Sequence, residues 1–225
     1  MTLVTARDIL CDDLLVVPPA VEPLSLEAVK LQRRFTSATL DDRFTAWITA
    51  AREHFEASAG LQLITATRVF LLECFPAQTR IAVWRAPVRS ILSIEYLDAS
   101  ETVQVVDPTT YEMFPPLLAG SPALPLTGSP YPSPGGVQLR GSTTWPVSVD
   151  RAGAVRILYT AGFGTSGEDV PAIIRDYALM QHIGDMHKFA ENLSERPVMD
   201  MPMGTTVIRR SAQGRMIPVD RLTRW

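Results

Sequence analysis

The chain has three histidines, His54, His182 and His187, and histidine is the side chain best suited to acid–base or metal chemistry near neutral pH. His182 and His187 are five residues apart, about 140° around a helix, so they do not share a helix face. His182 aligns better with Asp185, and His54 directly follows a glutamate, but neither set has a third ligand at a recognised spacing. The sequence therefore predicts no metal site and no cofactor. A small hydrolase built around His54 or His182 remains an alternative.

Motifs of other catalytic classes are incomplete. Residues 161–164 read AGFG, half of a glycine-rich phosphate loop without the rest of the pattern or a following lysine. No serine lies in a G-x-S-x-G sequence. Cys11 and Cys74 have neither metal-ligand nor redox spacing, which favours two reduced thiols in a protein made in cytoplasm. The sequence therefore predicts a protein that is not an enzyme.

Length and composition favour a globular protein. A chain of 225 residues with a hydrophobic fraction of 46% can bury a sizeable core. No run of about eighteen apolar residues is present, so no membrane span and no membrane partner are expected. The formal net charge of −3 argues against a protein whose main task is to hold nucleic acid.

Residues 41–60 carry the clearest helical pattern. Apolar residues recur at three- and four-residue steps and share one helix face: Phe44, Trp47, Ile48, Ala51 and Phe55. Asp41 and Asp42 suit the N-terminal end, and Gly60 suits the left-handed stop. Much of the remaining helix surface is expected to carry Arg43, Arg52, Glu53 and Glu56.

The predicted fold class is α+β, a small helical bundle core with an inserted antiparallel β domain and extended N- and C-terminal arms. Ser25 is the expected N-cap of a short helix, and Pro171 suits the first turn of the last helix. Gly184 is expected to interrupt that last helix. The predicted order is an N-terminal arm (1–24), a helical hairpin of the core (25–60), a β-rich insertion (61–165), a C-terminal core helix (166–195) and an extended basic tail (196–225).

Strands are predicted by the segments LQLITATRVFLLECF, TRIAVWRAPVRSILSIEYLD, TVQVV, TYEMF and AVRILYTAGFG, which are rich in β-branched and aromatic residues. The Ala86–Pro87 step is expected to separate two strands, because proline cannot donate within a ladder. We expect an antiparallel meander. The arm before it contains VVPPAVEP, which holds an extended path after a short helix and is ordered mainly if another surface holds it.

The segment from Pro115 to Gly136 is crowded with Pro, Gly and Ser and predicts a long loop that projects from the β region. Its leucines and tyrosine are too apolar for a solvated spacer, so docking onto a neighbouring subunit is expected: Leu117, Leu118, Leu124, Leu126 and Tyr131. From Gly204 onward, five arginines face one aspartate, a net charge of about +4. Such a tail can seek nucleic acid or an acidic protein surface.

The order of these parts resembles the phage head–tail connector (adaptor) family of long-tailed phages and gene transfer agents. The resemblance runs from about Ser25 to Glu191 and rests on the sequence of SLEAVK, AAREHFEASAG, an FP step, APVRSILSIEYLD, WP, VRILYTAGFG and a final helix. It implies a helical core with a β-rich insertion, and a ring of about twelve copies below the portal. Such a ring extends the DNA channel and docks the stopper or tail. Here MHKFAEN stands where the family often has an aromatic-Glu-Asn-Arg segment.

The resemblance implies a virion neck protein, assembled in the host cytoplasm, whose partners are its own copies, the portal and a stopper or tail-completion protein. Double-stranded DNA would pass without tight binding, because a ring that neutralised phosphates would hold the genome. The expected portal-binding residues are Val207, Ile208, Arg209, Arg210, Arg215 and Trp225. The expected subunit contacts are Phe44, Trp47, Arg52, Tyr177, Leu118 and Tyr131. The alternatives are a stopper or tail-completion protein of the same neck, or a DNA-binding packaging factor that uses the arginine-rich tail.

Overall fold

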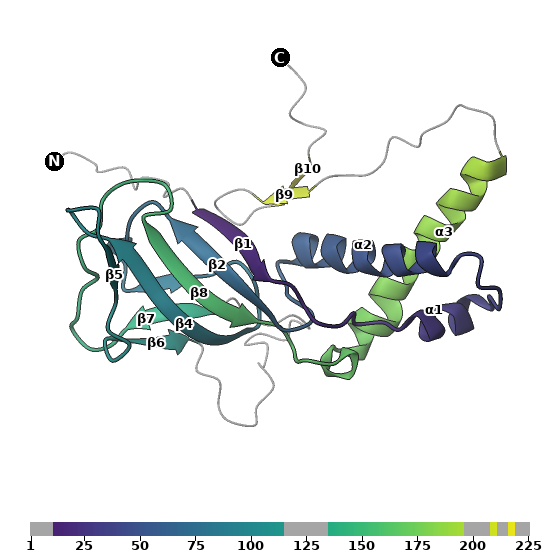
Figure 1. The fold of residues 1–225 in the computed structure, drawn as a ribbon, viewed down its shortest axis with the longest axis horizontal. Coiled ribbons are helices and arrows are strands. Elements are labelled where there is room, and N and C mark those ends of the chain that lie inside the picture. Colours follow the sequence, from purple (N-terminus) through teal and green to yellow (C-terminus); the bar gives the residue numbers. More distant parts are fainter. Residues whose placement is uncertain (1–10, 115–134, 196–207, 211–215, 219–225) are drawn as a thin grey trace, which may run out of the picture. The chain divides into compact units, whose positions relative to one another are not determined.

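The computed structural model describes residues 11–114, 135–195, 208–210 and 216–218, and the fold is α+β as predicted (Figure 1). The chain divides into a large unit, residues 9–183, and a second unit that includes residues 184–195 and two short strands near the C-terminus. No helix in the described ranges is long and apolar enough to cross a membrane.

The helical hairpin begins where the sequence predicts it. In α1 (Leu26–Arg33) the Ser25 hydroxyl accepts a hydrogen bond of 3.1 Å from the Ala28 amide, the expected N-cap. Helix α2 (Asp41–Ala59) ends at Gly60, whose φ of 67° is the left-handed conformation that glycine adopts without steric penalty. Lys30 of α1 donates to the Asp41 carboxylate at 2.6 Å, which joins the two helices.

The last helical segment starts after Pro171, as expected. A short 3₁₀ turn, η1 (Gly167–Asp169), precedes a π-helical stretch, η2 (Ile173–Leu179), which continues directly into α3 (Met180–Glu195). The expected interruption at Gly184 is wrong, because α3 runs through that residue without a break. A single glycine in a helix interior costs only about 1 kcal/mol, which the surrounding helix-forming residues offset.

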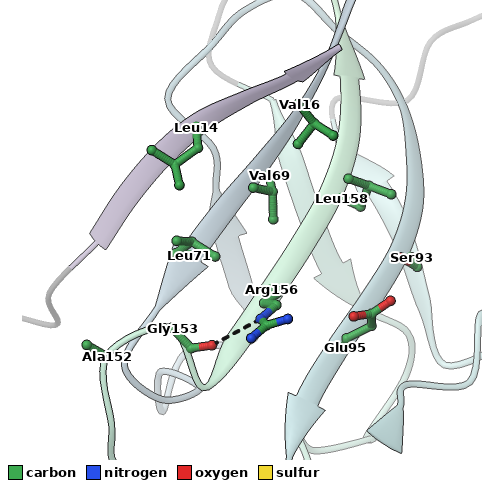
Figure 2. A pocket seen from close by; sticks show the side chains of 10 residues that line it. All are labelled: Leu14, Val16, Val69, Leu71, Ser93, Glu95, Ala152, Gly153, Arg156 and Leu158. Atoms are coloured by element: carbon green, nitrogen blue, oxygen red, sulfur yellow. Dashed lines mark hydrogen bonds between the residues drawn. The ribbon is translucent and has the colours of Figure 1, made fainter. Parts of the chain in front are cut away.

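The larger sheet has five antiparallel strands in the order β1-β2-β8-β4-β5. These strands are β1 (Cys11–Val17), β2 (Ala66–Leu72), β8 (Val155–Ala161), β4 (Val88–Leu97) and β5 (Val103–Val105). The predicted meander is therefore wrong, since β8 lies between β2 and β4. On one face of β8 the alternate side chains from Val155 to Ala161 are all buried. A central position also pairs both edges of this apolar strand with neighbouring strands. One face of this sheet carries Leu14, Val69 and Leu158 side by side (Figure 2).

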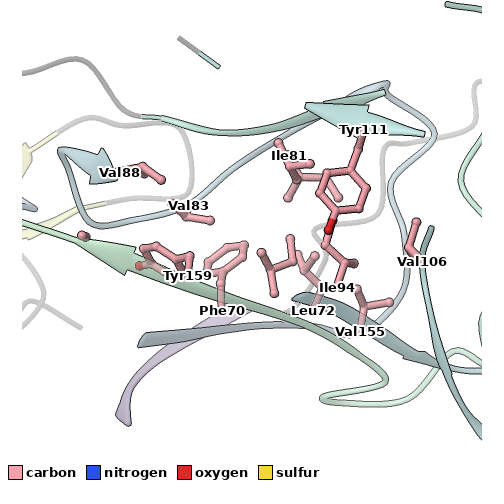
Figure 3. Close-up of a cluster of buried hydrophobic side chains, with 13 residues drawn as sticks. Phe70, Leu72, Ile81, Val83, Val88, Ile94, Val106, Tyr111, Val155 and Tyr159 are labelled. Atoms are coloured by element: carbon pink, nitrogen blue, oxygen red, sulfur yellow. The ribbon is translucent and has the colours of Figure 1, made fainter. Parts of the chain in front are cut away.

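A smaller sheet packs on the opposite face, with strand order β3-β7-β6. Its strands are β3 (Arg80–Ala82), β7 (Gly136–Leu139) and β6 (Tyr111–Phe114). Ile81 and Tyr111 from this sheet meet Phe70 and Val155 from the larger one in the main hydrophobic core (Figure 3). The Ala86–Pro87 step separates β3 from β4, as predicted.

The N-terminal segment differs from expectation. Residues 11–17 form neither a helix nor part of a free arm; they are the edge strand β1, paired with β2 from Cys11 opposite Leu72 to Val17 opposite Thr67. The run of apolar residues from Leu14 to Val17 suits a strand, and the prolines that follow end it. Residues 1–10 lie outside the described residues.

The second unit contains residues 184–195 of α3 and a β hairpin. Its strands β9 (Ile208–Arg210) and β10 (Met216–Pro218) pair antiparallel over three residues each.

Candidate functional site

A cluster of buried and half-buried charged side chains lies in the large unit, between α2 and the five-stranded sheet. Arg52 of α2 donates from Nε to Glu22 at 2.8 Å and from Nη1 to Glu56 at 3.1 Å. The helical pattern predicts Arg52 and Glu56 on the helix surface; that prediction is wrong, because both side chains are buried. Glu22, thirty residues before Arg52, supplies the partner that makes burial of the arginine tolerable.

The Glu56 carboxylate is the centre of the helical half of this cluster. Its Oε1 accepts hydrogen bonds of 2.8 Å from the Gln62 side chain and of 2.8 Å from the Leu63 amide. Burial raises the pKa of Glu56 above its ordinary value, and the Leu63 amide and Arg52 oppose that shift without cancelling it. The carboxylate is therefore fixed by several donors in a site with little water.

The strand half of the cluster is built around Asp13 of β1. Its carboxylate accepts from Arg68 Nε at 3.0 Å and from the Tyr159 hydroxyl at 2.9 Å, and Arg85 Nε lies 3.5 Å away. Burial raises the pKa of Tyr159 and the Asp13 charge raises it further, so Tyr159 stays protonated as a hydrogen-bond donor. Burial and the charge of Arg68 lower the pKa of Arg85.

Gln62 and Arg85 connect the two halves. The Gln62 side-chain oxygen accepts from Arg68 Nη1 at 3.2 Å while its nitrogen donates to Glu56. Arg85 also donates to the Glu56 and Leu61 carbonyls, at the end of α2. We call this set the charge junction: Asp13, Glu22, Arg52, Glu56, Gln62, Arg68, Arg85 and Tyr159. Its three carboxylates balance its three guanidinium groups. Because the hydrogen bonds run between different elements, the junction fixes α2 and the N-terminal segment to the sheet.

The histidines considered for catalysis form a packed pair. The rings of His54 and His182 stack with centroids 4.7 Å apart and planes 14° from parallel. Within the described ranges, no group of three or more His, Cys, Asp or Glu side chains is arranged to hold a metal ion. His54 lies on α2 and His182 on α3, so the stacked rings form a contact between these two helices.

The predicted subunit contacts are separated by the structure. Phe44 and Arg52 are buried within the single chain. Trp47 is half-buried and packs edge-on against Phe44, with ring centroids 5.3 Å apart. Tyr177 is 65% exposed. Leu118 and Tyr131 lie outside the described residues.

Tyr177 has an exposed apolar neighbour in the same helical stretch. Ile173, four residues earlier in η2, is 62% exposed. Arg175 beside them pairs with Asp176 at 2.7 Å and with Glu168 at 2.7 Å. The result is an exposed apolar pair flanked by ion-paired side chains, a composition suited to a protein contact.

The predicted tail residues belong to the second unit. Ile208, Arg209 and Arg210 form β9. Arg209 lies opposite Ile217 in β10. Val207, Arg215 and Trp225 lie outside the described residues.

The comparisons with known proteins are informative only at the level of structure. No protein-family model matches the chain. No curated protein matches it by sequence. A chain in the neck of an empty gene transfer agent (GTA) particle, computed with C6 symmetry, matches with a TM-score of 0.58 at 17% identity, over 88% of this chain and 91% of that one.

Two further structures agree. A chain in the virion of a native gene transfer agent particle has a TM-score of 0.56 at 17% identity, and covers 86% of this chain and 90% of its own length. A chain in the neck of a native particle computed with C12 symmetry has a TM-score of 0.54 at 19% identity, and covers 86% and 91%. This chain shares their fold. The similarity extends over most of the length of this chain and of each similar chain, so it includes both the helical and the β parts.

Proposed function

We propose that this protein is a structural subunit of the neck of a tailed particle, a head–tail connector that forms a ring below the portal. The observation that carries the proposal is the shared fold, over 86% to 88% of the chain, with chains of gene transfer agent neck and virion structures. The connector-like order of motifs in the sequence supports the same proposal.

The ring is proposed to contain twelve copies. Support comes from one neck structure with a similar chain that was computed with C12 symmetry; another was computed with C6 symmetry. A ring subunit makes a heterologous contact, in which two different surfaces of each copy meet. The exposed pair Ile173 and Tyr177 is a candidate for one of these surfaces, with Trp47 as a further candidate.

The ring is proposed to continue the DNA channel without holding DNA. The formal net charge of −3 supports this role, since strong phosphate binding requires a surplus of basic side chains and would resist passage of the genome. The charge junction contributes rigidity, because it fixes α2 to the sheet by paired charges that a neighbouring copy does not have to supply. No bond is made or broken in this function.

The basic tail is proposed to dock onto the portal through Val207, Ile208, Arg209, Arg210, Arg215 and Trp225. Removal of residues 204–225 should leave the large unit folded and abolish attachment to portal-bearing capsids. Capsids that still acquire the truncated protein and a tail would show that this assignment is wrong.

The alternative use of the tail is contact with DNA. It predicts that the full-length protein shifts the gel mobility of duplex DNA at nanomolar concentration in a salt-dependent manner, and that the truncated protein does not.

A stopper or tail-completion protein of the same neck is the second candidate, because the similar chains belong to neck and virion structures that contain several components. The two roles differ in their neighbour. A connector binds the portal directly, whereas a stopper binds only capsids that already carry a connector.

Electron micrographs of the purified protein test the ring itself: rings with a central hole are expected, and particles that stay single at every concentration would contradict it.

A further inference from the structure

One face of the five-stranded sheet is aliphatic and open. Five side chains from three adjacent strands project from it (Figure 2), and we call them the outer sheet face: Leu14, Val16, Val69, Leu71 and Leu158. Leu14 is 46% exposed and Val16 is 52% exposed, and the opposite face of β2 and β8 is filled by the main core. Contiguous exposed apolar surface of this kind marks an interaction site in a protein that is otherwise well packed.

The polar groups at the border of this face leave it electrically neutral. Glu95 of β4 and Arg156 of β8 are direct cross-strand partners, so opposite charges stand side by side. Arg156 also donates to the Gly153 carbonyl at 3.4 Å. A charged segment laid on the aliphatic centre would lose hydration without gaining a partner. The face therefore suits an uncharged, apolar occupant.

This chain contains a segment of that chemistry. Residues 115–134 include no charged side chain and seven prolines, together with four leucines and Tyr131. Proline has no amide donor, so a proline-rich segment buries few unpaired donors when it lies on an apolar surface. The match is in charge and polarity: a neutral aliphatic face and a neutral apolar segment, in a chain whose other long connections are charged.

The path of the chain favours a neighbouring copy over the segment's own sheet. Phe114 and Gly136 are direct partners across β6 and β7, so the segment leaves and returns at nearly one point. A twenty-residue excursion that returns to its origin extends about 33 Å at most. The sheet that contains β6 and β7 packs on the inner face, whereas the outer sheet face lies beyond the full thickness of the larger sheet. A second copy presents that face without such a detour.

We propose that residues 115–134 of one copy lie across the outer sheet face of the next copy. The proposal rests on the proposed ring and gives one of its heterologous contacts two named halves. Leu118 and Tyr131, expected from the sequence as subunit contacts, become the donor side, and Val69, Leu71 and Leu158 become the receiving side.

Two half-defective variants test it in the full-length protein. In the first, residues 117–132 are replaced by a short Gly-Ser linker; in the second, Val69→Lys and Leu158→Lys place charges on the outer sheet face. Each variant alone should associate at least tenfold more weakly than the wild type in mass photometry, and an equimolar mixture should form one-to-one dimers. The control is Val147→Lys, a charge at an exposed position away from the face.

A second measurement does not depend on the folding of the lysine variant. A labelled synthetic peptide of residues 115–134 should bind the loop-replaced protein saturably by fluorescence anisotropy, and the same peptide with Leu118→Glu and Tyr131→Glu should not. Absence of binding by the first peptide would overturn the proposal.

The other occupants give other outcomes, and each overturns the proposal. Strong dimerisation of the loop-replaced variant alone would show two sheet faces packed together. Wild-type protein that stays monomeric while the peptide binds would show docking within one chain. Rings that form equally well with both half-defective variants would reject this contact while leaving the proposed neck function intact. That function fails by a separate result, the absence of the protein from the neck of finished particles.

Discussion

The Gln62 side chain donates a hydrogen bond of 2.8 Å to the buried Glu56 carboxylate, and its oxygen accepts one of 3.2 Å from Arg68. One uncharged amide thus joins the helical half of the charge junction to the strand half. A buried charge network is tolerated only when every member has a partner. The network therefore specifies how α2, β1 and β2 are arranged. Its disruption should lower the free energy of unfolding and loosen the local structure.

Arg52→Met should be strongly destabilising. The substitution keeps an aliphatic side chain of similar length but leaves Glu22 and Glu56 without their guanidinium, and removal of one partner from a buried ion pair costs about 3–5 kcal/mol. Urea unfolding measures the change. Arg43→Met, the same substitution at an exposed position of the same helix, should change the free energy of unfolding by less than about 0.5 kcal/mol. An effect of Arg52→Met as small as that of the control would contradict the account.

Asp13→Asn should loosen the edge strand. The side chain keeps its shape, but Arg68 and Arg85 lose the carboxylate that faces them. We expect the amide hydrogens of β1 to exchange at least tenfold faster while those of β8 are nearly unchanged, because an edge strand opens locally before the sheet does. Asp12→Asn is the matched control at an exposed neighbour. Equal exchange in both variants would show that the ion pairs of Asp13 do not hold the strand.

Glu56 should give the protein a distinct dependence of stability on pH. Its folded pKa lies above the ordinary value of 4.5, so the folded state binds the proton more tightly than the unfolded state. The stability that this group contributes is complete below about pH 4.5 and is lost as the pH rises through the folded pKa.

Glu56→Gln removes this titration. The difference in unfolding free energy between wild type and variant should therefore fall steadily as the pH rises from 4.5, when measured by urea unfolding at several pH values. Other titrating groups act on both proteins and cancel. A difference that is flat, or that grows with pH, would rule out the raised pKa.

Tyr177→Glu should weaken self-association without unfolding the subunit. The side chain is mostly exposed, so its replacement leaves the core intact, whereas a carboxylate at a buried subunit contact loses its hydration. We expect at least a tenfold loss of association by analytical ultracentrifugation, with an unchanged thermal midpoint. Val147→Glu, at a more exposed position, is the control. Normal assembly of the Tyr177 variant would remove this surface from the ring contact.

The sequence predicted the elements better than their arrangement. Ser25, Gly60 and the Ala86–Pro87 step mark their boundaries by local backbone chemistry, which is readable without a fold. The position of β8 between β2 and β4 depends on contacts between residues far apart in the chain, and no local pattern encodes it. The charge junction was missed for the same reason: Arg52 and Glu56 have the spacing of an ordinary surface pair on a helix. Their burial is made possible by Glu22, which pairs with Arg52, and by Gln62 and the Leu63 amide, which donate to Glu56.

The central claim is that this protein builds a ring in the neck of a tailed particle. Cryo-electron microscopy of purified particles, with the neck reconstructed and this fold placed in the map, tests it most directly. The account predicts a twelve-copy ring of this chain immediately below the portal, surrounding the DNA channel. Finished particles whose neck contains no copy of it, with the protein recovered only as single subunits from the host cell, would contradict the account.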